Sequence, residues 1–136
     1  MQFETKIAVV LRDDLAVWQK TNVTAFLVSG IAGTVPDVVG EPYRDGSGNE
    51  YLPMFVQPVL VYEADRDALR RAYERALARD VTPAIYTHEL FATGHDEANR
   101  AAVAAVSAED LDLVGIAFRA ERRTVDKVVD RLRFHP

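Results

Sequence analysis

The chain has 136 residues, of which 49% are hydrophobic and 27% are charged, and its net charge is -5. The length fits one domain with one core, the apolar content excludes an intrinsically disordered chain, and the negative charge excludes nucleic-acid binding through overall basicity. The absence of cysteine excludes disulfides, a thiol nucleophile and thiolate zinc sites.

The sequence also predicts a location. No apolar run approaches the roughly 20 residues that cross a bilayer. Residues 1–6 lack the basic-then-apolar order of a signal peptide. We therefore expect a single cytoplasmic domain over residues 1–136 that has no membrane partner.

The first two elements are expected to be a strand and a helix. Residues 6–12 form a short, nearly continuous apolar run with several β-branched side chains, which is typical of a strand buried on both faces. Residues 16–32 change to helical spacing, and Gly33 is suited to end the helix. The apolar face of this helix comprises Val23, Phe26, Leu27, Gly30 and Ile31.

A proline-rich segment with a strong turn signal follows the first helix. Residues 45–49 read Asp-Gly-Ser-Gly-Asn, so we predict a long loop that contains a small hairpin. The stretch from Pro42 to Pro58 also holds Tyr43, Tyr51, Leu52, Met54 and Phe55. Apolar side chains in a turn-rich segment indicate a subunit contact, which predicts a homo-oligomer such as a homodimer held through this stretch.

Strands and helices alternate in the rest of the chain. Strands are expected at residues 59–62, 82–87 and 113–118, and helices after Asp65, at residues 96–106 and at residues 125–130. Asp65 and Thr124 are suited to cap the second and the last of the four helices. The alternation favours a mostly parallel sheet with helices on both faces.

Both ends of the chain resemble peptidyl-tRNA hydrolase II. At the start, residues 6–15 join a strand to the sequence Arg-Asp-Asp-Leu. At the end, residues 125–128 and 132–134 are similar to that family's closing helix and tail. The resemblance implies the backbone of that α/β domain.

The working residues of the hydrolase do not carry over. Asn22 stands at the position of its lysine, and Phe26 and Ser29 stand at the positions of its glutamine and histidine. The family shows an Asp and a Thr after its third strand, and residues 87–91, Thr-His-Glu-Leu-Phe, lack that pattern. An ester hydrolase needs a charge or a proton donor at the developing oxyanion, so we do not expect peptidyl-tRNA hydrolase activity.

A closer resemblance covers nearly the whole chain. Residues 21–27, 90–99 and 110–116 are similar to the bacterial family known as domain of unknown function 2000. This resemblance implies a three-layer α/β/α sandwich on a mixed four-stranded sheet, with the same peptidyl-tRNA hydrolase II-like fold. It implies no established activity.

The richest polar cluster follows the third predicted strand, at the sheet edge where open α/β folds place ligands. The cluster comprises Thr87, His88, Glu89, Thr93, His95, Asp96 and Asn99. Asn22 and Thr24, which we expect to open the first helix, can join the same crevice. The residues predicted to bind a small molecule or an anion are therefore Asn22, Thr24, Thr93, His95, Asp96 and Asn99.

Plainer roles explain several of these residues. Thr93 and Asp96 are suited to cap the helix that follows them, as Asn22 and Thr24 are suited to cap the first helix. Trp18 either stacks on a ligand ring or plugs the core over a helix end.

Three functions stay open: a small-ligand binding module, a hydrolase with His88 or His95 as its base, and a homo-oligomeric interaction protein. The histidine spacing matches no standard zinc motif, and the sequence has no phosphate loop, dinucleotide fingerprint or serine elbow. We therefore predict neither a metal nor a cofactor. Residues 119–136 carry six basic and three acidic side chains, which either contact nucleic acid or form a solvated face.

Overall fold

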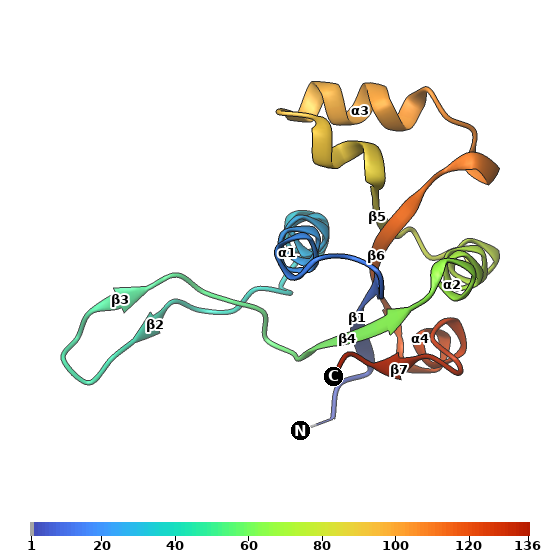
Figure 1. Cartoon of the computed structure of the whole chain (residues 1–136). Coiled ribbons are helices and arrows are strands. Elements are labelled where there is room, and N and C mark those ends of the chain that lie inside the picture. Colours follow the sequence, from blue (N-terminus) through green and yellow to red (C-terminus); the bar gives the residue numbers. More distant parts are fainter. Residues whose placement is uncertain (1) are drawn as a thin grey trace.

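The computed structural model describes residues 2–136 and contains a five-stranded main sheet in the order β5-β6-β1-β4-β7 (Figure 1). Its strands are β1 (Thr5–Arg12), β4 (Val59–Ala64), β5 (Ala84–Thr87), β6 (Leu113–Glu121) and β7 (Arg133–Phe134). The four predicted strands are all present, and β7 is the additional fifth strand that the expected count of four omitted.

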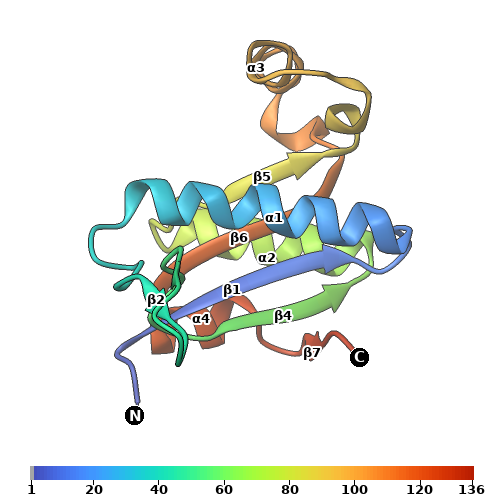
Figure 2. The same ribbon diagram turned by 90° about the vertical axis from the view of Figure 1, so that its left-hand side faces the viewer.

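The sheet is mixed. Only β1 and β4 pair in parallel, whereas β6 runs antiparallel to both β1 and β5, and β7 runs antiparallel to β4. The mixed sheet that the family resemblance implies is confirmed, whereas the mostly parallel sheet inferred from the alternation of elements is wrong. The physical reason is that the chain after β5 folds beyond this edge strand, where α3 lies, instead of crossing a face of the sheet, so β6 returns in the opposite direction (Figure 2).

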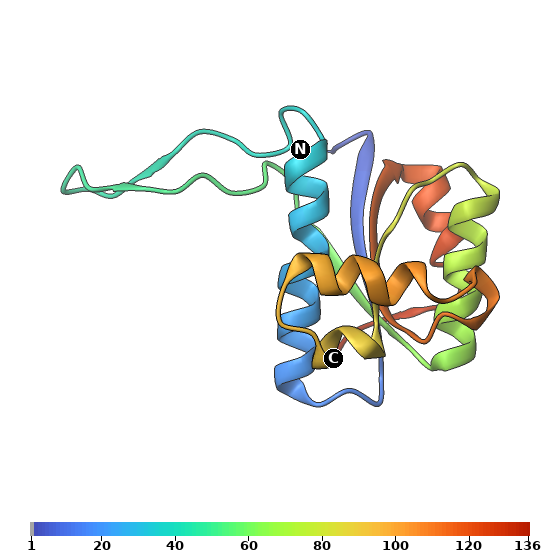
Figure 3. The same cartoon turned by 90° about the horizontal axis from the view of Figure 1, so that it is seen from above.

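Helices cover both faces of the sheet. The helices are α1 (Val17–Thr34), α2 (Arg66–Ala78), α3 (Asp96–Ala104) and α4 (Arg122–Val128). Seen from above, α1 lies on one side of the sheet and α2 and α4 lie on the other (Figure 3). No helix within residues 2–136 combines the length and the apolar character that a membrane crossing requires.

The central strand β1 is buried on both faces, as predicted. Ile7 and Val9 point into the core beneath α1, whereas Ala8 and Val10 point into the core beneath α2 and α4. All four side chains are fully buried. Burial on both faces explains why this strand reads as a continuous apolar run rather than an alternating one.

Two helix ends differ from the prediction. α1 continues through Gly33 and ends at Thr34, where the N–H of the capping residue Val35 donates to the carbonyl of Ile31 at 3.0 Å. α4 begins directly after β6, so its first residue is Arg122 and Thr124 does not cap it. Gly33 and Thr124 are local sequence signals for a helix end, whereas packing against the sheet determines how far each helix extends.

The N-cap of α2 is confirmed. The Asp65 side chain accepts a hydrogen bond from the Ala68 N–H at 2.8 Å. We expect Asp65→Ala to lower the free energy of unfolding by about 1 kcal/mol, because the helix then loses its capping acceptor. Urea denaturation measures this loss. Asp67→Ala is the control, since Asp67 lies in the same turn without a capping bond, and equal losses in the two variants would contradict the assignment.

A hairpin projects from the body of the molecule (Figures 1 and 3). Strands β2 (Tyr43–Arg44) and β3 (Glu50–Tyr51) pair antiparallel, which confirms the long loop with a small hairpin. We call residues 40–56 the arm. Its large apolar side chains that are between 49% and 85% exposed are Tyr43, Tyr51, Leu52, Met54 and Val56.

Asp45 closes the turn at the tip of the arm. Its carboxylate accepts hydrogen bonds from the Tyr51 hydroxyl at 2.7 Å and from the Ser47 and Asn49 N–H groups. These bonds, that of Tyr51 first, hold the pKa of Asp45 well below its ordinary value of 3.8. A carboxyl group whose pKa is lowered on folding stabilises the folded state at every pH above its ordinary pKa. This stabilisation is lost as the pH falls through the lowered pKa.

We therefore expect the turn of the arm to persist when the pH is lowered to 3.8. The NMR shifts of the Ser47 and Asn49 amide protons measure this, and they should stay constant from pH 7 to pH 3.8. Asp45→Asn is the control, because its turn should show no carboxyl titration at any pH. A transition centred on the ordinary carboxyl pKa would contradict the proposed bonding.

Candidate functional site

Five of the six predicted ligand-binding residues line one crevice of about 270 Å³. They are Asn22, Thr93, His95, Asp96 and Asn99, and the other lining residues are Trp18, Phe26, Tyr86, Leu90, Phe91 and Gly94. One wall is α1, and the other consists of the short 3-10 helix His88–Ala92 and the start of α3. We call this hollow the amide crevice.

The sixth residue, Thr24, lies elsewhere. α1 begins at Val17, so Asn22 and Thr24 lie in its second turn and neither opens the helix. Side chains that are two positions apart on a helix point about 200° away from each other. The Thr24 hydroxyl donates to the Lys20 carbonyl at 2.8 Å, and its side chain borders a separate groove on the other flank of α1. The expectation that both residues cap the helix and share one crevice is therefore wrong.

Hydrogen bonds tie the floor of the amide crevice together. The Asn22 amide donates to the Tyr86 hydroxyl at 3.4 Å, and that hydroxyl donates to the Leu90 carbonyl at 3.5 Å. The Thr93 hydroxyl lies 2.9 Å from the same carbonyl and also contacts the side-chain oxygen of Asn99, and its single proton is donated to one of these two acceptors. This chain of contacts fixes both asparagine side chains before any ligand arrives.

Tyr86 is the buried centre of this network. Its side chain is 5% exposed, and burial raises its pKa above the ordinary value. A raised pKa keeps the hydroxyl protonated at neutral pH, so it can accept from Asn22 and donate to Leu90 at the same time.

His95, rather than Thr93 or Asp96, caps α3. Its Nδ1 accepts the Ala98 N–H at 3.2 Å, which leaves Nε2 as the protonated nitrogen of the neutral ring. Asp96 instead pairs with Arg100 at 2.7 Å, one turn along the helix. His95 therefore offers a donor at the rim of the crevice.

The other candidate base, His88, does not line the crevice. It is exposed and packs edge-on against Phe91, with ring centroids 5.7 Å apart. Within residues 2–136, no carboxylate bonds to His88 or His95, whereas a general base is normally oriented by such a partner. The positions of these two histidines therefore do not support a hydrolase that uses either of them as its base.

Aromatic rings form the apolar wall of the crevice. Trp18 and Tyr86 both pack against Phe91, with centroid distances of 5.7 Å and 5.1 Å, and Phe26 packs against Tyr86 at 6.0 Å. Trp18 is 61% exposed and Phe26 is 54% exposed. Trp18 is thus the second residue of α1 with a face open to solvent, and the expectation of a core plug is wrong.

Sequence reasoning missed the aromatic residues of the crevice other than Trp18. Phe26 was assigned to the buried face of α1, and Tyr86 and Phe91 were not assigned to a site. A signal was available for Phe26, because it lies four residues after Asn22 and so shares its side of the helix. For Tyr86 and Phe91, the signal was only their nearness in sequence to the polar cluster.

The charge of the crevice distinguishes between ligand classes. Asp96 is the only acid among its lining residues, and within residues 2–136 no lysine or arginine lines it. A bare anion would lack a cation to offset its loss of water. In the same part of the chain, no three histidine, aspartate or glutamate side chains gather into a metal-binding group.

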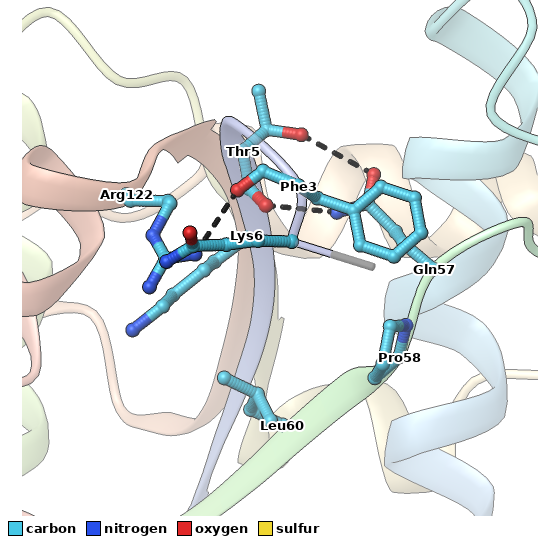
Figure 4. Close-up of a pocket in the computed structure, with 8 residues that line it drawn as sticks. Phe3, Thr5, Lys6, Gln57, Pro58, Leu60 and Arg122 are labelled. Carbon is cyan, nitrogen blue, oxygen red and sulfur yellow. Dashed lines mark hydrogen bonds between the residues drawn. The ribbon is translucent and has the colours of Figure 1, made fainter.

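A second cavity, of about 280 Å³, lies at the other end of the sheet (Figure 4). Its polar centre is Gln57, which is 7% exposed. The Gln57 amide donates to the Thr5 carbonyl at 3.0 Å and accepts from the Thr5 hydroxyl and from Arg119, each at 3.3 Å. Because these groups satisfy one another, the cavity presents less unused hydrogen-bonding capacity than the amide crevice does.

The basic residues of the C-terminal segment are dispersed. Arg119 bonds to Gln57 and Arg133 contacts Glu63, each on a different part of the sheet. Arg123 and Lys127 border a common hollow, which is completed by Arg75, Arg79, Asp126 and Asp130. Four cations and two acids leave a surplus of two positive charges there, smaller than the surplus of three over residues 119–136.

Comparisons with known proteins place the chain in a family. The family model described as "Protein of unknown function (DUF2000)" matches residues 5–136, so the chain belongs to that family, as its resemblance predicted. It is also similar to a solved structure, a protein of unknown function named Atu0240 from Agrobacterium tumefaciens strain C58. The two are 52% identical, the match covers 99% of this chain and 100% of the other, and the TM-score is 0.96. No curated protein matches the chain.

Proposed function

We propose that the chain binds a small molecule in the amide crevice, and that the ligand is a neutral planar ring carrying hydrogen-bond donors and acceptors. The observation that carries this is the joint presence of the exposed Trp18 ring with the Asn22 and Asn99 side-chain amides in one hollow. Rings stack on tryptophan, and amides recognise mixed donor and acceptor edges.

The unused polar groups define the ligand more closely. Asn22 donates one N–H to Tyr86, and its amide oxygen remains free to accept a hydrogen bond. The Asn99 oxygen contacts the Thr93 hydroxyl, its amide nitrogen keeps two N–H donors, and His95 adds the donor at Nε2. With the Asp96 carboxylate as a further acceptor, the crevice presents both acceptors and N–H donors around an aromatic wall. This suits a nucleobase-like edge better than a phosphate, because the carboxylate repels an anion.

Trp18 provides the test, because it is the only tryptophan of the chain. Its fluorescence is titrated with the four ribonucleosides and, in a separate arm, with inorganic phosphate and sulfate. We expect saturable quenching by at least one nucleoside and none by the anions. Asn99→Ala should weaken that binding about tenfold, the effect of losing about 1.4 kcal/mol of hydrogen bonding.

Asn49→Ala is the matched control, since Asn49 is an asparagine of the arm outside the crevice. It should leave the titration unchanged. Quenching by phosphate alone would favour an anion site. Absence of saturable quenching by any nucleoside, or equal affinity in Asn99→Ala and wild type, would overturn the proposal.

The arm supports a second proposal, self-association through the stretch from Pro42 to Pro58. Leu52 and Met54 are 85% and 58% exposed on a hairpin that projects from the body. Exposed apolar side chains of this size are costly unless a partner covers them. Light scattering should give a dimer for the wild-type chain and a monomer for the double variant Leu52→Ser, Met54→Ser. A wild-type monomer across micromolar concentrations would contradict it.

We also propose that the fold is a three-layer sandwich like that of peptidyl-tRNA hydrolase II. The support for this is that α1 covers one face of the sheet while α2 and α4 cover the other. The proposal does not extend to that enzyme's reaction, because Asn22 supplies an uncharged amide to the crevice where the resemblance expects a lysine.

A further inference from the structure

The face of the sheet beneath α1 is only partly covered. α1 packs against β1, β5 and β6, and Figure 2 shows β4 and β7 running below it without a helix in front. A groove of about 560 Å³ lies along this uncovered flank, which is within the range of about 300–1,000 Å³ for small-molecule sites. We call it the aliphatic groove. It is on the opposite flank of α1 from the amide crevice.

Most of the surface that lines the groove is apolar, although Lys20, Thr21, Thr24 and His135 also border it. Leu11 of β1 and Val61 of β4 line it, and Val17 and Ala25 of α1 line its other side. Val17 is 79% exposed and Val61 is half-buried, so both keep apolar surface in contact with water. A ligand that covers them with methylene groups gains the free energy of removing that surface from water.

One end of the groove is cationic. The Lys20 ammonium lies 3.0 Å from Nε2 of His135. An ammonium only donates, so Nε2 accepts and the ring carries its proton on Nδ1, which lies 3.0 Å from the Pro136 backbone oxygen. Lys20 keeps two further N–H donors for an acceptor in the groove.

Lys20 has no salt-bridge partner among residues 2–136. Glu63 is a buried carboxylate on the same face, and it is paired by the guanidinium of Arg133. The Glu63 carboxylate lies 4.0 Å from Nε2 of His135 and does not reach Lys20. The Lys20 ammonium is therefore available to a carboxylate at one end of the groove.

We propose that the aliphatic groove binds an aliphatic monocarboxylate, with its carboxylate on Lys20 and its chain over Val61 and Leu11. A charge-assisted bond from the ammonium supplies the directional contact, and the apolar lining supplies the affinity for the chain. The site is separate from the amide crevice, so either proposal can fail without the other.

Calorimetric titration with octanoate, octanamide and acetate tests the assignment. Octanoate should bind at least tenfold more tightly than octanamide, which has the same chain without the charge, and acetate should show no binding in the same range. Equal affinities for octanoate and octanamide would overturn the role of Lys20. Equal binding of acetate and octanoate would overturn the role of the apolar lining.

Two variants locate the site. Lys20→Gln should reduce the affinity for octanoate about tenfold and abolish its preference over octanamide, whereas Lys127→Gln, on the other face of the sheet, should change neither. Ala25→Phe fills the groove from an exposed helix position and should abolish binding of both ligands. Octanoate binding that survives Ala25→Phe, or that Lys20→Gln leaves unchanged, would overturn the proposal.

Discussion

Gly115→Ala is expected to lower the free energy of unfolding by about 1–3 kcal/mol, and Gly115→Val by more. Gly115 lies on β6 directly beneath α1, and a Cβ atom there would approach Val23 Cγ1 to 2.7 Å and Leu27 Cδ1 to 3.2 Å. Both neighbours are buried side chains of α1. Since they cannot move into solvent, the helix itself must shift, and α1 carries Asn22 and Lys20.

Gly33→Ala is the control for this prediction. Gly33 lies in the last turn of α1, and a Cβ there meets nothing within 4 Å. The exchange should raise the stability by up to about 1 kcal/mol, because alanine favours the helix. Chemical denaturation of both variants measures the difference. Adding Val23→Ala to Gly115→Ala should recover part of the loss, and the account fails if Gly115→Ala is as stable as wild type.

Arg12→Met is expected to cost about 1–3 kcal/mol, because the Leu113 carbonyl loses a donor, whereas the carboxylates left behind are 61% and 31% exposed. Arg12 is 5% exposed at the end of β1, and its guanidinium donates to Asp14 at 2.7 Å, to Asp112 at 2.9 Å and to the Leu113 carbonyl at 3.2 Å. The loss is limited further because Asp112 keeps Arg66 at 3.1 Å.

The Arg12 network also supports the amide crevice. The Asp112 carbonyl accepts the His88 N–H at 2.9 Å, so Arg12 ties the start of β6 to the segment that forms one wall of the crevice. Arg66→Met is the control, because Arg66 shares Asp112 but is exposed, and its loss should cost about 0–1 kcal/mol. Equal losses in Arg12→Met and Arg66→Met would contradict the role of burial.

The same network gives a pH dependence. The hydrogen bond from Arg12, with burial opposing it, lowers the pKa of Asp14 below its ordinary value of 3.8. Asp14 therefore contributes stability above pH 3.8, and this contribution is lost as the pH falls through the lowered pKa. We expect the wild type to lose stability in that range, and Arg12→Met to lose less, as measured by denaturation from pH 5 to pH 2.

The sequence predicted the strands and helices well where burial alone decides them. The run at residues 6–12 became β1, buried on both faces, and Asp65 caps α2 as its position indicated. Strand direction was beyond local patterns. Whether β6 runs parallel or antiparallel to β1 depends on where residues 88–112 lie, and only the assembled fold sets that path.

The two-residue strand β7 illustrates another limit. Arg133–Phe134 is too short to show any alternation, and it is a strand only because it pairs with Tyr62 and Glu63 of β4. The stacking of Phe134 on Tyr62, with centroids 4.8 Å apart, holds it there. Such a strand follows from tertiary contact and not from its own sequence.

The polar residues of the amide crevice were predictable because most of them follow one strand. Thr93, His95, Asp96 and Asn99 are close in sequence, and the end of β5 brings them to one edge. Asn22 joined them and Thr24 did not, because both lie inside α1, where residues two positions apart point about 200° away from each other. The cationic end of the aliphatic groove escaped sequence analysis because Lys20 and His135 are 115 residues apart.

The most direct test of small-ligand binding is an NMR titration that follows the Trp18 indole N–H and the side-chain amides of Asn22 and Asn99. The titrant is the ribonucleoside that quenches Trp18 most strongly. If the ligand binds in the amide crevice, we expect these three signals to shift together with one dissociation constant. The signal of the Thr24 backbone amide, on the other flank of α1, should not shift. Shifts centred on Thr24, or no shift at the Trp18 indole at saturating nucleoside, would contradict it.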